Sequence, residues 1–163
     1  MKLILVIFVI LFLTACYGRT PHKTGLEGRP MPSTDLLLAD SSTHLNSNNI
    51  PTDKPIVIFL FGPHCPYSHA QMKEIIQDME NLKNIRFYIL TSTPFSQMKE
   101  FYEHYQLKKY SNIVSGVDYN HSFADYFEIP GVPYLAIYGK NKKMKAAFVG
   151  KTLSRHIKEA AEK

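Results

Sequence analysis

Residues 56–68 read IVIFLFGPHCPYS. The first six side chains are β-branched, aromatic or leucine with no polar interruption, which is typical of a strand buried on both faces of a sheet. Apolar residues then recur at the helical spacings of three and four, at Met72, Ile75, Met79 and Leu82. The stretch therefore predicts a central strand that leads into a helix, with Cys65 at the start of that helix.

The chain around this stretch alternates between strand and helix patterns. Short apolar runs predict further strands over residues 85–90, 113–117, 134–138 and 145–149. Helices are expected from Pro94, capped by Thr93, to about Tyr105, over residues 122–127, and from a Thr152 cap to Ala161. Residues 36–38 indicate an edge strand, followed by a polar turn over 40–49. This alternation predicts a layered α/β domain with a partly parallel sheet.

Length and composition exclude several classes of protein. The 163 residues suit one domain, and 45% hydrophobic with 20% charged residues is an ordinary globular balance, unlike that of a disordered or multi-span membrane protein. The net charge of +5 comes from scattered lysines and arginines rather than a basic stripe, so nucleic acid is not an expected partner. Two cysteines, Cys16 and Cys65, exclude a disulfide-stapled mini-protein and a cysteine-only zinc site.

The N-terminus has the pattern of an export signal. Residues 3–13 are uncharged and apolar, too short to span a bilayer comfortably but suited to a signal-peptide core. The following Leu13-Thr14-Ala15-Cys16 resembles the lipobox of bacterial lipoproteins, which implies a signal peptide over residues 1–15 and a lipid on Cys16. The alternative is an uncleaved signal anchor. In some bacteria an aspartate directly after the lipidated cysteine retains a lipoprotein in the inner membrane. Tyr17 occupies that position here, so the sequence does not indicate the membrane leaflet.

Glycine and proline are frequent before the predicted domain. From Tyr17 to about Ser33 the chain has this composition and few large apolar residues, which predicts a flexible tether over residues 16–33 and a domain over 34–163. We expect a monomer in the cell envelope, held by the lipid on Cys16 to a bacterial membrane and facing the periplasm or the outside.

Two motifs in this order carry a resemblance to the thioredoxin superfamily over about residues 36–163. Cys65-Pro66-Tyr67-Ser68 follows a strand, and Gly131-Val132-Pro133 precedes a later one. The chain is most similar to the membrane-tethered, extracytoplasmic (TlpA-type) thioredoxin-like and redoxin-like proteins of bacteria. The resemblance implies a mixed central sheet flanked by helices. It also implies a nucleophilic Cys65, a cis Val132–Pro133 bond facing it, and substrate contacts by Pro66, Tyr67, Val132 and Pro133.

The motif departs from its relatives at Ser68, where they carry a second cysteine. A helix N-terminus lowers a cysteine pKa from about 8.5 towards 3.5 to 7.5, and the Ser68 hydroxyl lowers it further by hydrogen bonding. Without a resolving cysteine, however, the mixed disulfide must await an external thiol. We therefore expect monothiol exchange with thiol- or disulfide-containing exported proteins, with no cofactor; the rival interpretation is a binding module that has lost catalysis.

Histidines beside the cysteine leave further alternatives open. His64 directly precedes Cys65 and is a candidate to stabilise its thiolate or to act as a base, whereas His69 on the first turn is as well explained by solvation. A metal site on these three residues lacks a fourth ligand, so no metal is expected. A one-cysteine peroxidase would need a threonine or serine where Gly62 stands and an arginine near the thiol, for which Arg86 is a poor candidate.

Overall fold

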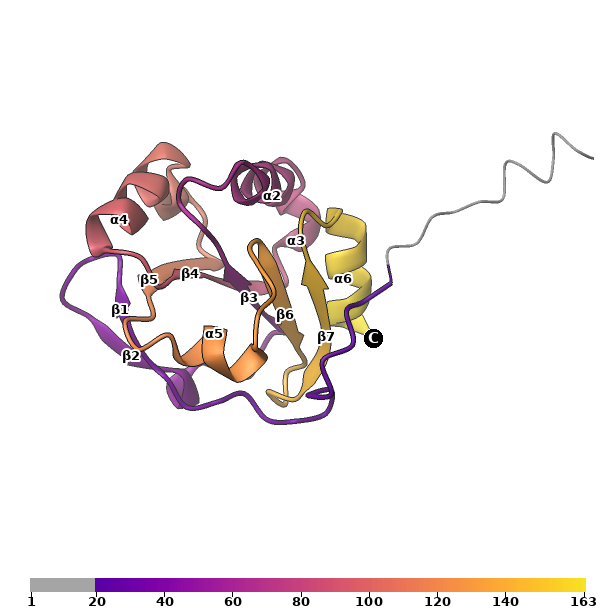
Figure 1. The fold of residues 1–163 in the computed structure, drawn as a ribbon. Helices are drawn as coiled ribbons and strands as arrows, with labels where there is room; N and C mark the ends of the chain where they lie inside the picture. The colour runs from indigo at the N-terminus through magenta and orange to yellow at the C-terminus, as the bar shows by residue number, and fades with distance from the viewer. Residues whose placement is uncertain (1–19) are drawn as a thin grey trace, which may run out of the picture.

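The computed structural model describes residues 20–163, and a seven-stranded mixed sheet runs through its centre (Figure 1). The strands are β1 (Asp35–Leu38), β2 (His44–Asn46), β3 (Ile56–Leu60), β4 (Arg86–Thr91), β5 (Ile113–Val117), β6 (Tyr134–Tyr138) and β7 (Met144–Val149). Their order in the sheet is β2-β1-β5-β4-β3-β6-β7. β3, β4 and β5 are parallel, while β1, β6 and β7 each run antiparallel to the strands they pair with. β3 is therefore an interior strand between β4 and β6, and all five of its residues are buried, as the unbroken apolar run predicts.

Helices cover the sheet unequally on its two faces. They are α2 (Pro66–Gln77), α3 (Met79–Leu82), α4 (Phe95–His104), α5 (Ser122–Phe127) and α6 (Ser154–Glu162), with 3-10 turns η1 (Ser47–Asn49) and η2 (Leu107–Lys109). The first core joins one sheet face to α2, α3, α4 and α6, through residues such as Phe59, Met72 and Phe101. The second core places α5 on the opposite face, where Phe123 and Phe127 pack on Tyr134 and Tyr138 (Figure 1).

The outermost strands differ from the sequence-based expectation. Residues 36–38 were expected at a sheet edge, but β1 lies between β2 and β5, because part of the predicted polar turn forms β2 and pairs with it. Close pairing of β1 with β5 depends on Gly116, since a β-carbon there would lie 2.7 Å from the Leu37 carbonyl oxygen. The sheet thereby gains a strand that apolar patterning does not reveal.

Neither threonine predicted as an N-cap has that role. The residue before α4 is Pro94, with no side-chain cap, and the Thr93 hydroxyl lies 3.1 Å from that of Thr91. Leu153 precedes α6, while the buried Thr152 hydroxyl donates to the Gly150 carbonyl. Both hydroxyls thus bond to groups two residues earlier in the chain instead of to the helix amides.

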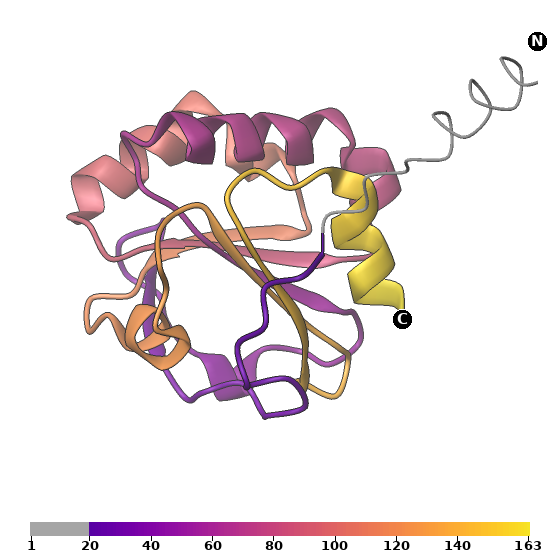
Figure 2. The same ribbon diagram turned by 45° about the vertical axis from the view of Figure 1, so that its right-hand side comes forward.

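The N-terminal segment of the described chain lies on the outer edge of β7 (Figure 2). The His22 amide donates to the Ala147 carbonyl at 2.8 Å, and the Gly28 amide donates to the Met144 carbonyl at 2.8 Å. Met31 is 8% exposed and belongs to the second core. A flexible tether over residues 16–33 is therefore wrong for residues 22–31, because backbone pairing and Met31 fix them to the domain.

Candidate functional site

Cys65 stands at the junction of β3 and α2, as the sequence predicts. It is the N-cap residue of α2 in extended conformation, and Pro66 occupies the first helical position. Its amide donates to the Gly62 carbonyl at 3.0 Å, which closes the turn. A proline costs little here, because its missing N–H has no partner within the helix. The half-buried sulfur consequently lies beside the unpaired amides of the first helical turn.

The surroundings of the sulfur favour its thiolate form. Burial raises the pKa of Cys65, but hydrogen bonds from the Ser68 amide, the Ser68 hydroxyl and the Tyr67 amide outweigh burial, and the pKa is lowered. Ser68 itself is fully buried, and its hydroxyl oxygen accepts the Gly62 amide at 3.2 Å. Because that oxygen accepts from Gly62, its own hydrogen is available to the sulfur.

The Val132–Pro133 loop faces the cysteine from the start of β6. The Val132–Pro133 bond is cis, as the resemblance implies, and the Cys65 thiol lies 3.6 Å from the Val132 carbonyl oxygen. Gly62 completes the contact, since a β-carbon there would lie 3.1 Å from Val132 Cγ2 and 3.2 Å from Cys65 Cβ. The structure thus brings Cys65 and Ser68 of the β3–α2 junction together with Val132, from two separate parts of the chain.

The remaining predicted residues lie around this centre. Pro66 and His64 are exposed, Tyr67 is 66% exposed, and Pro133 is buried. His64 lines a 330 Å³ pocket between the cysteine loop and α4, which His69 and His104 also line. No group of three histidine, cysteine or carboxylate side chains within residues 20–163 is arranged to hold a metal ion.

His69 is more strongly connected than its sequence context suggests. Its Nε2 lies 2.7 Å from the Pro63 carbonyl oxygen, and its Nδ1 lies 2.7 Å from the Tyr105 hydroxyl. The only sequence signal was its place on the first helical turn. His69 therefore joins the candidate site as a residue that the sequence left unassigned.

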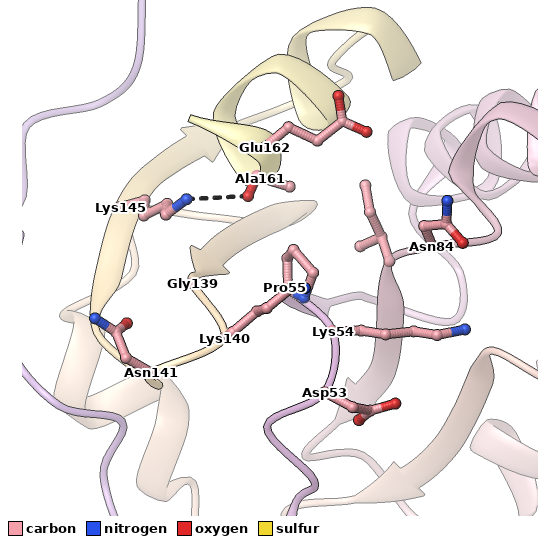
Figure 3. A pocket seen from close by; sticks show the side chains of 11 residues that line it. Asp53, Lys54, Pro55, Asn84, Gly139, Lys140, Asn141, Lys145, Ala161 and Glu162 are labelled. Carbon is pink, nitrogen blue, oxygen red and sulfur yellow. Dashed lines mark hydrogen bonds between the residues drawn. The ribbon is translucent and has the colours of Figure 1, made fainter.

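A larger hollow of 640 Å³ lies at the opposite end of the parallel strands (Figure 3). It is lined by Pro55 and Ile85, which directly precede β3 and β4, and by lysines such as Lys145, whose Nζ donates to the Ala161 carbonyl at 3.1 Å. Arg86 lies at this same end, paired with Asp53 at 3.0 Å. Hence Arg86 does not approach Cys65, and the hollow belongs to no predicted site residue.

Two sequence-based expectations concern the membrane. The signal peptide and the lipidation of Cys16 lie outside the described residues. Across residues 20–163, no helix has the length and apolar character that a membrane crossing requires.

Comparison with known proteins identifies the architecture. No protein-family model and no curated protein sequence matches the chain. Among solved structures, the thioredoxin domain of a thiol-disulfide oxidoreductase from Bacteroides vulgatus is similar at a TM-score of 0.65 and 13% identity, covering 83% of this chain and 95% of that one. A thio-disulfide isomerase from Thermus thermophilus gives a TM-score of 0.65 and 21% identity, covering 82% and 93%.

A third similar structure is a secreted disulfide oxidoreductase from Mycobacterium tuberculosis, with a TM-score of 0.59 and 17% identity over 73% of this chain and 84% of that one. These identities are low, so the likeness concerns the backbone arrangement rather than the activity. With the cis-proline loop facing a cysteine at a helix start, the match leads to one conclusion: the chain has the thioredoxin-like fold, a mixed central sheet flanked by helices.

Proposed function

We propose that this protein is an exported, lipid-anchored protein that carries out monothiol thiol–disulfide exchange through Cys65. The observation that carries the proposal is the place of Cys65 at the start of α2 with the buried hydroxyl of Ser68 where a dithiol site has its second thiol. Hydrogen bonds from Ser68 and Tyr67 there outweigh burial and lower the pKa of Cys65. A lowered pKa supplies thiolate, which is the nucleophile in disulfide exchange. The structurally similar oxidoreductases and isomerase support the same reaction class.

The exchange needs one cysteine and one external thiol. The Cys65 thiolate attacks one sulfur of a substrate disulfide, a bond forms between Cys65 and that sulfur, and the other substrate sulfur leaves as a thiolate. A second thiolate, from the substrate or a partner, then attacks the substrate sulfur of the mixed disulfide and releases the Cys65 thiolate. One disulfide is consumed and one is formed, so the protein shuffles disulfides without net oxidation or reduction.

The surface beside the sulfur suits an extended segment of a protein substrate. Tyr67 is 66% exposed, and Val132 is half-buried at the start of β6. An exposed aromatic ring beside a loop suits peptide binding, with apolar contact from the ring and hydrogen bonds from the loop backbone. We infer that Pro66, Tyr67, Val132 and Pro133 contact cysteine-bearing segments of exported proteins.

Lipidation of Cys16 would keep this chemistry near a membrane. His22 is already paired with β7, so the chain between Cys16 and His22 is all that separates the anchor from the domain. Six residue steps extend at most about 20 Å. Mass spectrometry of the wild-type protein is expected to show a chain that begins at a lipid-bearing Cys16, and Cys16→Ser is expected to carry no lipid; an unmodified Cys16 in the wild-type protein would contradict lipid anchoring.

The decisive experiment measures the pH dependence of Cys65 alkylation. In a chain that begins at residue 16 and carries Cys16→Ser, Cys65 is the only thiol. We expect an apparent pKa well below about 8.5 and a trapped mixed disulfide with a disulfide-containing peptide. Cys65→Ser should abolish the trapped species. An ordinary pKa together with undiminished peptide binding would instead identify a non-catalytic binding module.

A second variant tests the geometry of the site. Ser68→Cys places a thiol where the hydroxyl now meets the Cys65 sulfur, so we expect a disulfide between Cys65 and the introduced thiol, and insulin-reducing activity in the presence of a reductant. Wild-type protein lacks that second thiol and should reduce insulin far more slowly. Failure of the variant to form any intramolecular disulfide would contradict the proposed arrangement.

A further inference from the structure

His69 lies between the cysteine loop and α4. It is half-buried on the first turn of α2, and its ring packs against Phe101 of α4 with centroids 5.1 Å apart. Nε2 lies 2.7 Å from the Pro63 carbonyl oxygen, and Nδ1 lies 2.7 Å from the Tyr105 hydroxyl oxygen. The ring therefore links the loop before Cys65 to Tyr105, which directly follows α4.

The partners of the ring determine where its hydrogen lies. A carbonyl oxygen only accepts, so Nε2 must carry the hydrogen and donate it to Pro63. In the neutral ring Nδ1 is then an acceptor, and the single hydrogen of the Tyr105 hydroxyl is shared between Nδ1 at 2.7 Å and the His69 carbonyl oxygen at 3.3 Å. The two ring nitrogens thus face Pro63 and Tyr105 rather than the Cys65 sulfur. His69 therefore affects the Cys65 thiol by fixing the position of the loop that contains Pro63.

The loop that His69 holds is the one that places the sulfur. Pro63 is buried, and two bonds fix its neighbours: the Cys65 amide donates to the Gly62 carbonyl at 3.0 Å, and the Gly62 amide donates to Ser68 Oγ at 3.2 Å. Without the bond from His69, the Pro63 carbonyl would lose its side-chain partner. The loop would then be freer to move the sulfur away from the Tyr67 and Ser68 donors.

We propose that His69 is a positioning residue for Cys65, which fixes the cysteine loop through the Pro63 carbonyl and is itself oriented by Tyr105. The inference rests on the proposed thiol chemistry of Cys65 and adds a residue to it. It assigns the role of supporting histidine to His69 rather than to the exposed His64 beside the cysteine.

Two amide variants separate the two hydrogen bonds of the ring. His69→Gln carries its amide nitrogen near the place of Nε2 and retains a donor for Pro63, whereas His69→Asn reaches only the place of Nδ1 and retains the contact with Tyr105. Both variants are uncharged, so a difference between them does not come from the charge of the ring. Tyr105→Phe removes the orienting hydroxyl and leaves the imidazole in place.

The readout is the apparent pKa of Cys65, from alkylation rates across pH in the chain with Cys16→Ser. We expect His69→Asn to raise the apparent pKa by about one unit, which lowers the alkylation rate about tenfold at a pH below the pKa. His69→Gln should stay within about twofold of the wild-type rate, and Tyr105→Phe should fall between them. Equal rates for the Gln and Asn variants would overturn the proposal, as would rate losses that simply follow the melting temperatures.

Hydrogen exchange at the Cys65 amide supplies a readout that does not depend on thiol reactivity. We expect faster exchange in His69→Asn than in His69→Gln, because only the former frees Pro63. If wild-type Cys65 has an ordinary pKa but the hydrogen-exchange rates of the two variants differ in this way, the proposed thiol–disulfide exchange fails and the positioning role stands. If the wild-type pKa is lowered and the exchange rates of the two variants are equal, the positioning role fails alone.

Discussion

At the scale of single residues, one oxygen atom connects both sides of the cysteine turn. Ser68 Oγ accepts the Gly62 amide at 3.2 Å, and its hydrogen bond to Cys65 helps to lower the pKa of the thiol. A second cysteine at this position would offer a weaker donor and acceptor. The serine therefore supports a stable thiolate while it removes the means of closing an internal disulfide.

Removing the Ser68 hydroxyl should make the thiol less acidic. In Ser68→Ala the Cys65 thiolate loses a donor, so we expect its apparent pKa to rise by about one unit and the alkylation profile to move to higher pH. At a fixed pH below the pKa, the rate falls because less thiolate is present. Ser115→Ala is the matched control, since Ser115 is also buried but its hydroxyl has no partner among residues 20–163. Identical profiles for both variants would exclude a role for Ser68.

A side chain at Gly62 should disturb the contact between the cysteine and its facing loop. Gly62→Ala places a β-carbon 3.1 Å from Val132 Cγ2 and 3.2 Å from Cys65 Cβ, so these groups must separate. We expect a several-fold slower trapping of peptide disulfides and a loss of about 1 kcal/mol in the free energy of unfolding. Gly131→Ala, whose β-carbon would meet no atom of the described chain within 4 Å, should change neither quantity appreciably.

At the scale of elements, α2 is held at one end by the cysteine turn and along its length by the connection between β7 and α6. The Gln71 side chain donates to the Thr152 carbonyl at 3.1 Å and accepts its amide at 2.6 Å. Glu74 accepts the Ser154 amide at 3.1 Å and pairs with Lys151 at 3.1 Å. The helix that carries Cys65 is thereby fixed to the sheet through polar contacts as well as through its apolar face.

These contacts predict an acid-sensitive contribution to stability. Burial raises the pKa of Glu74, but its bonds to Ser154 and Lys151 outweigh burial and lower it below the ordinary value. A carboxyl with a lowered folded-state pKa stabilises the fold above its unfolded-state pKa and loses that contribution as pH falls through the folded-state pKa. We expect the free energy of unfolding to decline below about pH 5, and Glu74→Gln to remove about 1 kcal/mol of that decline.

Denaturant titrations at several pH values would measure this effect. Glu80→Gln is the control, because Glu80 is exposed on α3 and pairs with Lys83, which is also exposed. If Glu74→Gln and Glu80→Gln show the same dependence on pH, the contacts of Glu74 contribute nothing specific.

The elements that the sequence predicts well are those set by local pattern. The unbroken run before Gly62 gives β3, and the helical spacing after Pro66 gives α2, so the cysteine is placed correctly at their junction. The caps predicted at Thr93 and Thr152 are wrong, because each hydroxyl bonds two residues earlier in the chain. The first amide of α6, that of Ser154, donates instead to Glu74, 80 residues away. Local sequence carries no sign of such a partner.

The candidate site likewise contains some contacts that local sequence predicts and others that depend on distant residues. Ser68 lies on the same helical turn as Cys65, so its contact with the sulfur is local. The resemblance of the two sequence motifs to those of thioredoxin-like proteins predicts that Val132 faces Cys65. The connection from Pro63 through His69 to Tyr105 depends on how α4 packs on α2, which neither motif determines. The sequence already makes Arg86 a poor candidate for the arginine that a peroxidase needs near its thiol. The structure agrees, because Arg86 is the first residue of β4, at the end of the strand away from Cys65, and pairs with Asp53.

At the scale of the whole molecule, the domain begins earlier than composition suggests. Residues 22–31 pair with the outer edge of β7 and the turn that precedes it, and Met31 enters the second core. Glycine and proline mark this stretch as irregular in sequence. Irregular backbone can still be fixed when a sheet edge offers it donors and acceptors.

Truncation tests this boundary. A chain that begins at residue 34 loses the backbone bonds to β7 and the buried Met31 side chain, so we expect its free energy of unfolding to be at least about 3 kcal/mol lower than that of a chain beginning at residue 20. Denaturant midpoints of the two proteins provide the measurement. Equal midpoints would show that residues 20–33 only rest on the domain.

The covered edge of β7 also bears on how copies of the protein behave when they are crowded together. A bare edge strand offers unpaired amides and carbonyls to any passing chain and is a common start of aggregation. In the described sheet, residues 22–31 occupy that edge on one side, and the three-residue β2 ends the sheet on the other. Short or covered edges give a neighbouring copy little backbone to pair with. The segment before the predicted domain thereby favours dispersed molecules over fibrils where the local concentration of the protein is high.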